Sequence, residues 1–300
     1  MDWILLSLAS AGMFGVLTAF DKRLIDKHLP SLGSFYAIVA ISLVFSGLVG
    51  LGAAGGLESA PAGRLLAAGL SGFCWATALA FMFWGYKLEE ASRVTAIVHV
   101  FPVFVALMAV GFLGESLATG QWLAIATVVA GAMLVSLRGS ARHGFTRLTR
   151  AFPVLIGASL FFALAHLTGK YALAEVSVWL VYALRNFTMA ILLFFLARPK
   201  AFRQIVGAMR DRKTLAMVVA AEFVLAPIAA LSVTVATSLG PVSLVAAISA
   251  TRPFFVFILT TILSMPPVGL LNEPLERNTL ALKLVSVALI VAGTGALSLL

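Results

Sequence analysis

Charge is scarce in this chain of 300 residues: only 11% of them are Asp, Glu, Lys or Arg, whereas soluble domains average about 25%. Hydrophobic residues make up 61% of the chain, and its mean hydropathy is +1.07. This combination excludes a soluble globular protein. The chain is therefore predicted to be an integral membrane protein that crosses the bilayer several times.

Cysteine is almost absent, since Cys74 is the only one in the sequence and lies in an apolar run. One cysteine excludes an intramolecular disulfide and any cysteine-based metal cage. The sequence also lacks a Walker-type phosphate loop, zinc-ligand spacing and a convincing Ser-His-Asp set. We therefore expect no enzyme activity, no catalytic residues, no metal and no cofactor.

Apolar runs of about 20 residues recur along the chain, and each is long enough to cross a bilayer as a helix. A bilayer admits only helices or closed barrels, and barrel strands would alternate in polarity over about ten residues. The unbroken runs therefore predict an all-α membrane protein with ten transmembrane helices. The predicted spans are 3–21, 33–52, 64–87, 92–113, 117–137, 152–173, 177–197, 214–237, 241–264 and 280–299.

The formal net charge of +9 comes from basic residues between the spans. In a soluble protein such a charge would indicate nucleic acid, but in loops it sets orientation, so we expect no nucleic-acid partner. The positive-inside rule places the linker 138–151 and the loop 198–213 in the cytoplasm, with both termini outside. Residues 200–213 are expected to be a solvated basic loop rather than an amphipathic surface helix.

Two stretches, 91–137 and 240–300, carry similar landmarks in the same order. Pro102 and Pro253 each lie inside an apolar run, 151 positions apart, and Lys22 and Lys170 each end the first helix of a half. Each half has five spans, so two similar halves must have opposite orientations, as in many transporters. The sequence therefore predicts a five-helix repeat at 1–138, a basic cytoplasmic linker at 139–151 and an inverted second repeat at 152–300.

These landmarks resemble the EamA domain, the five-span repeat of the bacterial drug/metabolite transporter superfamily. In the first half they are Ala91-Ser92, Pro102-Val103-Phe104, Gly114-Glu115-Ser116, Gln121 and Gly131-Ala132-Met133. In the second half they are Gly240-Pro241, Arg252-Pro253, Asn272-Glu273-Pro274 and Gly293. The chain departs from the family in two places: the second helix of the first half lacks the arginine that Arg185 supplies in the second half, and the segment 265–278 is longer than its counterpart.

The resemblance covers nearly the whole chain and implies two inverted bundles around a central cavity. Helices 1, 3, 4, 6, 8 and 9 would line this cavity, while helices 5 and 10 would be peripheral and available for dimer contacts. It also implies a multi-pass protein of the bacterial inner (cell) membrane. Its partners would be the lipid bilayer and a small-molecule substrate, and the protein would be a monomer or homodimer.

Ionisable residues inside spans are costly and usually face a cavity or a partner. The candidates are Arg185, Glu222, Arg252, His99, His166 and, toward a helix end, Lys170. At about 1.5 Å per residue, Arg252 lies about 16 Å from the outer face and Glu222 about 12 Å from the cytoplasmic face. One interpretation is an Arg252–Glu222 ion pair that only fixes packing, and another is that the arginines extend to the interface or bind lipid.

The functional interpretation gives these residues two roles. Arg252 and Arg185 would bind a carboxylate or phosphate through their planar donors, together with His99, His166, Trp75 and Tyr182. Glu222 and Lys170 would serve coupling or gating. Pro102 and Pro253 are expected to kink their helices and act as hinges, although kinks that only improve packing fit the sequence equally well.

The sequence thus favours a secondary active transporter that exports a small anionic or zwitterionic metabolite, an amino acid or organic anion, by alternating access. Proton-coupled efflux of cationic or lipophilic drug-like compounds is the alternative in which Glu222 and the aromatic residues dominate. A flippase for a lipid-linked metabolite is a third possibility, with 265–278 at the rim of an opening toward the bilayer.

Overall fold

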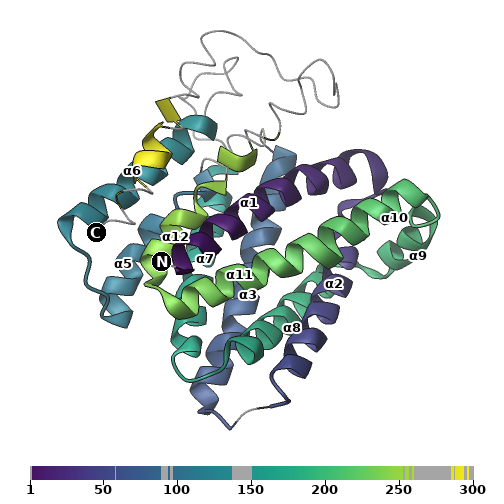
Figure 1. Ribbon diagram of the computed structural model, residues 1–300. Coiled ribbons are helices and arrows are strands. Elements are labelled where there is room, and N and C mark those ends of the chain that lie inside the picture. Colours follow the sequence, from purple (N-terminus) through teal and green to yellow (C-terminus); the bar gives the residue numbers. More distant parts are fainter. Residues whose placement is uncertain are drawn as a thin grey trace.

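A computed structural model shows the chain as a bundle of helices, and no strand occurs among the residues it describes (Figure 1). Those residues are 2–57, 59–88, 94, 97–136, 151–252, 254–256, 259, 285–286, 288–293 and 296. The predicted linker 139–150, the insertion 265–278, Pro253 and most of the predicted last span lie outside them. The all-α prediction is confirmed for the described part of the chain.

The helices follow the predicted apolar runs closely. The first half contains α1 (Asp2–Arg23) with its π-helical extension η1 (Leu24–His28), α2 (Leu32–Ala53), α3 (Ala62–Leu88), α5 (Phe101–Leu113) and α6 (Thr119–Ser136). The second half contains α7 (Ala151–Leu173), α8 (Val178–Ala197), α9 (Pro199–Ala208), α10 (Arg212–Val218), the π-helix η3 (Val219–Leu225), α11 (Ala226–Leu239) and α12 (Val242–Ser249).

Among the residues that the structure describes, six helices are long and apolar enough to cross a membrane, which supports a multi-pass membrane protein. They are Asp2–Asp21, Leu32–Ala53, Ala62–Gly85, Ala151–Leu173, Val178–Ala197 and Arg212–Leu239. The last of these joins α10, η3 and α11 into one continuous helix.

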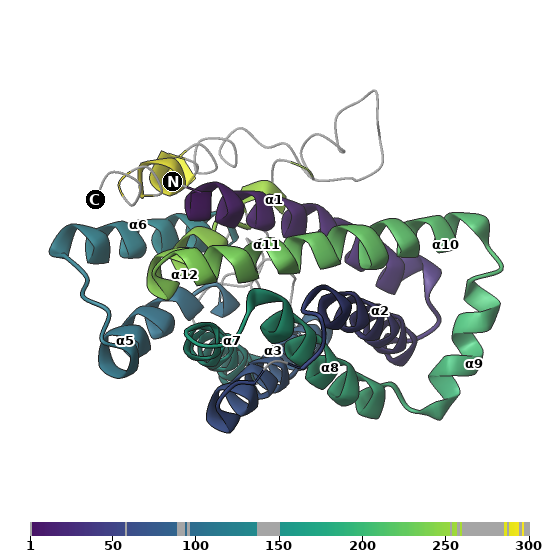
Figure 2. The ribbon, with the colours of Figure 1, turned by 60° about the horizontal axis from the view of Figure 1, so that its bottom comes forward.

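Helices of one half lie against helices of the other. The close pairs are α1 with α11, α2 with α8, α3 with α7 and α5 with α12, and α1 and α11 lie side by side in both ribbon views (Figures 1 and 2). Glycines permit some of the closest approaches, because an added Cβ at Gly131 would lie 2.8 Å from Ile290. The two halves are therefore intertwined rather than separate bodies.

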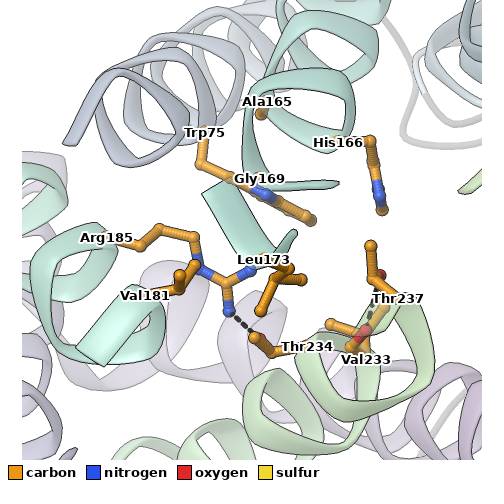
Figure 3. A pocket seen from close by; sticks show the side chains of 10 residues that line it. All are labelled: Trp75, Ala165, His166, Gly169, Leu173, Val181, Arg185, Val233, Thr234 and Thr237. Atoms are coloured by element: carbon orange, nitrogen blue, oxygen red, sulfur yellow. Dashed lines mark hydrogen bonds between the residues drawn. The ribbon is translucent and has the colours of Figure 1, made fainter. Parts of the chain in front are cut away.

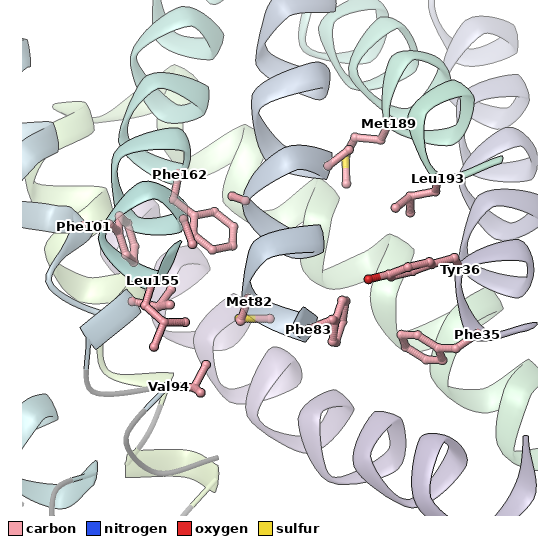
Figure 4. Close-up of a cluster of buried hydrophobic side chains, with 14 of the residues drawn as sticks. Phe35, Tyr36, Met82, Phe83, Val94, Phe101, Leu155, Phe162, Met189 and Leu193 are labelled. Atoms are coloured by element: carbon pink, nitrogen blue, oxygen red, sulfur yellow. The ribbon is translucent and has the colours of Figure 1, made fainter. Parts of the chain in front are cut away.

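Aromatic and aliphatic side chains fill the space between α2, α3, α7 and α8 (Figure 4). Phe35 of α2 meets Phe83 of α3 edge to face, with 5.3 Å between ring centroids. In lipid the hydrophobic effect does not drive helices together. Close van der Waals packing of such buried side chains holds the helices together instead. This core holds α3 and α7 in place. These two helices supply aromatic side chains to the cavity described below.

The expectation of a solvated loop at 200–213 is wrong. Residues Pro199–Ala208 form α9, which begins with proline at its first turn, where no backbone donor is required. Ala201, Ile205 and Ala208 recur at helical spacing and pack against the core, and Phe202 stacks on Phe194 of α8 at 5.7 Å. The charged residues that made the segment resemble a loop occupy the opposite face of an amphipathic helix.

Pro102 breaks the predicted span 92–113 rather than kinking a continuous helix. Residues 99 and 100 form a turn, and α5 begins at Phe101 with Pro102 in its first turn. The Val103 amide donates to the Val100 carbonyl, and 151 positions later the Phe254 amide donates to the Thr251 carbonyl. The same backbone hydrogen bond therefore occurs at corresponding positions of the two halves.

Asp211 caps the start of α10 and supplies a test of pH dependence. Its carboxylate accepts from the Thr214 hydroxyl at 2.7 Å and from the Thr214 amide at 3.1 Å. These hydrogen bonds from Thr214 hold the pKa of Asp211 below its ordinary value. A lowered pKa means that the stabilisation is present above the unfolded-state pKa and is lost as pH falls through the folded-state value.

We therefore expect Asp211→Ala to lower the thermal unfolding midpoint modestly in detergent at about pH 7, and less at about pH 3. Asp211→Asn is the matched control, since asparagine still caps a helix but does not titrate. An Asp211→Ala deficit of equal size at both pH values would show that the carboxylate charge contributes nothing.

Candidate functional site

A cavity opens between six helices near the middle of the bundle. Its empty volume, with the open side included, is about 490 Å³. Its lining comes from α1, α3, the turn before α5 and the start of α5, α7, α11, and the segment at the end of α12. These are helices 1, 3, 4, 6, 8 and 9 of the predicted spans, the set that the resemblance implies.

Among the described residues that line this cavity, Arg252 is the charged one. Its guanidinium donates to the Thr18 hydroxyl of α1, from Nη2 at 2.7 Å and from Nε at 3.2 Å. The same group lies 4.9 Å from the centre of the Phe14 ring. Arg252 follows the turn that ends α12, so an interrupted helix presents this charge to the cavity.

A second, smaller cavity of about 270 Å³, also counted with its open side, adjoins the first and contains Arg185 (Figure 3). Arg185 lies on α8, is 8% exposed, and donates from Nη2 to the Thr234 hydroxyl at 2.7 Å and to the Ala230 carbonyl at 3.2 Å. Because the Arg185 side chain lines this cavity, the guanidinium is placed to recognise an anion there. Thr234, which the sequence analysis missed, holds it in place.

Trp75, His166 and Val233 line both cavities. The His166 ring stacks on Phe101 with 5.4 Å between centroids and 9° between planes, and Trp75 lies 5.5 Å from His166. His99, in the turn before α5, also lines the larger cavity. Four of the six predicted substrate-binding residues, Arg252, His99, Trp75 and His166, thus meet at one cavity, and Arg185 lies in the next.

Tyr182, the sixth predicted substrate-binding residue, is 2% exposed, and its hydroxyl donates to the Pro227 carbonyl at 3.2 Å. It is outside the lining of both cavities in the described part of the chain. An aromatic residue in a span packs against helices at least as readily as it faces a cavity, so its position follows from packing.

Glu222 meets a partner that the sequence analysis did not consider, Asp21. The two carboxyl groups, from η3 and the end of α1, are within hydrogen-bonding reach of each other, and the charge of Arg252 acts on Asp21. The sequence offered one signal: Asp21 directly follows the apolar run of the first span, so it is part of the helix rather than of the basic loop.

Lys170 and Glu115 hold the connection between α11 and α12 and the start of α12 in place through hydrogen bonds. Lys170 Nζ donates to the carbonyls of Thr237 and Gly240, each at 2.8 Å. Glu115 accepts from the Val242 amide at 2.7 Å and from the amide and hydroxyl of Ser243. A first-half carboxylate therefore caps the start of α12 in the second half, a contact between halves at one end of the bundle.

Comparisons with known proteins agree with this architecture. Residues 1–137 match the EamA-like transporter family. An "Uncharacterized transporter in cobO 3'region" from Sinorhizobium sp is 28% identical over 135 residues, which cover 45% of this chain and 94% of that protein.

A solved structure described as "Crystal structure of protein" has a TM-score of 0.73 at 17% identity, over 99% of this chain and 97% of that one. At this identity the likeness shows the fold alone. The family match and the transporter relative therefore support the predicted resemblance to EamA-type transporters, and both cover less than half of the chain.

Proposed function

We propose that this protein is a secondary active transporter that exports a small anionic or zwitterionic metabolite, such as an amino acid or organic anion. The observation that carries the proposal is the pair of arginines in adjoining cavities, Arg252 and Arg185, which share the wall of Trp75 and His166. No carboxylate lines either cavity among the residues described. A positive, partly apolar hollow favours an anionic group with a small organic body.

Transport would proceed by alternating access of two inverted five-helix repeats, 1–138 and 152–300, in the bacterial inner membrane with the linker 139–151 in the cytoplasm. Two observations support the repeats. The Val103–Val100 and Phe254–Thr251 backbone hydrogen bonds are 151 positions apart, and the pairing of α1 with α11 corresponds to that of α3 with α7 when the halves are exchanged. Ten spans are the count that gives the halves opposite orientations.

The two halves would rock about the cavity, with the breaks near Pro102 and Pro253 as hinges. Lys170 would act as a gate, because opening that end of the bundle requires its two hydrogen bonds to the α11–α12 connection to break. Glu222 would be the coupling residue.

Efflux of cationic or lipophilic drug-like compounds is the second candidate, favoured by the aromatic lining of the larger cavity. Phe14, Trp75, Phe101 and Phe162 all face it, and aromatic faces attract organic cations. In this case Arg252 would repel the substrate, which makes the two candidates separable by the charge of what is transported.

A flux screen in proteoliposomes tests the proposal. The purified chain is reconstituted, and uptake of labelled neutral and acidic amino acids, dicarboxylates and quaternary ammonium compounds is compared with that of protein-free liposomes. We expect flux above the control for at least one amino acid or organic anion and none for the cations. Flux of cations alone, or of no soluble compound, would overturn the proposal.

A further inference from the structure

We propose that Asp21 and Glu222 form a proton-binding site whose occupancy is linked to anion binding at Arg252. The inference rests on the proposed function only for the identity of the anion, because the proton site itself stands on the geometry of the two carboxyl groups. It assigns a role to Asp21 and makes the coupling element a pair, with one member from each half of the chain.

The two carboxyl groups are withdrawn from water and incompletely hydrogen-bonded. Asp21 is 9% exposed and Glu222 is 3% exposed. Asp21 Oδ1 and Glu222 Oε1 are buried without a hydrogen-bond partner among the described residues, although the two side chains are within reach of each other. Two adjacent buried carboxylates repel strongly, and a single shared proton removes the repulsion and supplies the missing donor.

The local backbone is unusual at Glu222 as well. It lies in η3, a π-helical segment of seven residues within the continuous helix from Arg212 to Leu239. The Ser42 hydroxyl of α2 donates to the Glu222 backbone carbonyl. Helical segments of this kind are uncommon and are often found where a side chain must be held for function.

Arg252 is the basic group whose charge acts on the pair, through Asp21. The other elements that pack against η3 contribute less: α11 contains no titratable residue, and Arg212 and Lys213 of α10 are exposed. On α2, Tyr36 packs its ring against Phe83 at 6.1 Å. The charge that balances the pair is therefore the one that lines the larger cavity.

This arrangement gives the linkage a sign. Arg252 lines the cavity and contacts Thr18, one helical turn before Asp21 on α1, so the same guanidinium is close to both the cavity and the carboxyl pair. An anion bound to Arg252 offsets its positive field, and the pair then holds its proton more firmly. Linkage is reciprocal, so protonation of the pair also favours anion binding.

The proton and the anion are therefore expected to cross the membrane in the same direction. The proton comes from water on the side to which the site is open and returns to water on the other side, with only O–H bonds formed and broken. Export would then be driven by the outward gradient of the substrate, and an inward proton gradient would oppose it.

The test needs no substrate, because removal of the Arg252 charge imitates its neutralisation by an anion. The full chain in lipid nanodiscs is titrated while infrared difference spectroscopy follows the carbonyl band of buried protonated carboxyl groups. Wild-type protein should show one such band at neutral pH, and it should be lost in Asp21→Asn together with Glu222→Gln. Arg252→Gln should retain the band to more alkaline pH, whereas Arg185→Gln, the matched control, should not.

Size-exclusion profiles and tryptophan fluorescence confirm that each variant is folded. If the double variant does not fold, Asp21→Asn and Glu222→Gln are each measured alone. A band that survives in folded variants lacking the carboxyl groups would overturn the proton site. A band that titrates identically in wild type and Arg252→Gln would overturn the linkage. Neither result depends on the flux screen, so failure here is distinct from failure of the proposed transport activity.

Discussion

Gly72→Ala should destabilise the folded protein more than the same substitution at any other glycine of α3. A Cβ at this position would lie 2.0 Å from the Thr188 hydroxyl oxygen and 2.2 Å from the Arg185 backbone carbonyl oxygen on α8. The hydroxyl can rotate away, but the carbonyl belongs to the helix backbone, so α3 and α8 must separate. Overpacking of this kind costs roughly 1–3 kcal/mol or more.

The matched control is Gly69→Ala, one turn earlier on the same face. There an added Cβ would lie 3.4 Å from Thr188 Cγ2, an ordinary van der Waals contact. The two variants add the same methyl group to the same helix and differ only in the space available. We expect Gly69→Ala to unfold like wild type in mixed detergent micelles and Gly72→Ala to unfold at clearly lower denaturing-detergent fraction or temperature.

Equal stability of the two glycine variants would show that α3 and α8 are farther apart in the membrane than described. The clash has a functional consequence too, because Arg185 provides both the obstructing carbonyl and a cavity side chain. Displacement of α8 by the added methyl group would move its guanidinium away from Thr234, so transport should fall along with stability.

The positions of the helices could be predicted from the sequence because they depend on a local property. A run such as 33–52 is apolar over the whole length of a bilayer crossing, and it became α2 at Leu32–Ala53. The basic residues in 200–213 led to the wrong prediction of a loop, because charge alone does not distinguish a loop from the polar face of an amphipathic helix. The apolar residues Ala201 and Ile205 carried the information that was overlooked.

Part of the cavity was predictable for a related reason. An arginine or histidine inside a span needs a polar surrounding, so Arg185, Arg252, His99 and His166 were expected to face the interior. Their mutual arrangement was not, because it depends on which helices of the two halves lie together. Tyr182 shows the limit, since its ring is compatible with both a cavity and a packed helix interface.

The Asp21–Glu222 contact lay beyond sequence reasoning. The two residues are 201 positions apart and in different halves, and the ion pair that one interpretation of the sequence offered for Glu222 was with the nearest deep charge, Arg252. In the structure the charge of Arg252 acts on Asp21 instead, and Glu222 joins through that carboxyl group. Sequence spacing measures depth along a helix but does not show which faces of two helices meet.

Arg252→Ala should abolish most transport of the anion that the flux screen identifies. The substitution removes the charged residue of the larger cavity and its hydrogen bonds to Thr18, while the fold keeps the rest of the lining. A hydrogen bond to a charged group contributes about 1.5–3 kcal/mol. We therefore expect the initial rate at low substrate concentration to fall by about tenfold to a hundredfold, measured in proteoliposomes at matched protein content.

Arg252→Lys separates charge from geometry in the same assay. Lysine keeps the positive charge but cannot present two donors in a plane to a carboxylate, so partial activity with weaker apparent affinity is expected.

Arg212→Ala is the control. Arg212 is exposed at the start of α10 and lies outside both cavity linings, so this variant should transport like wild type. If Arg252→Ala kept full anion flux while Arg212→Ala lost it, the cavity would not be the binding site and attraction at the membrane surface would explain selectivity. An increase in cation flux in Arg252→Ala would instead indicate that Arg252 excludes cations from a cavity whose aromatic wall can otherwise bind them.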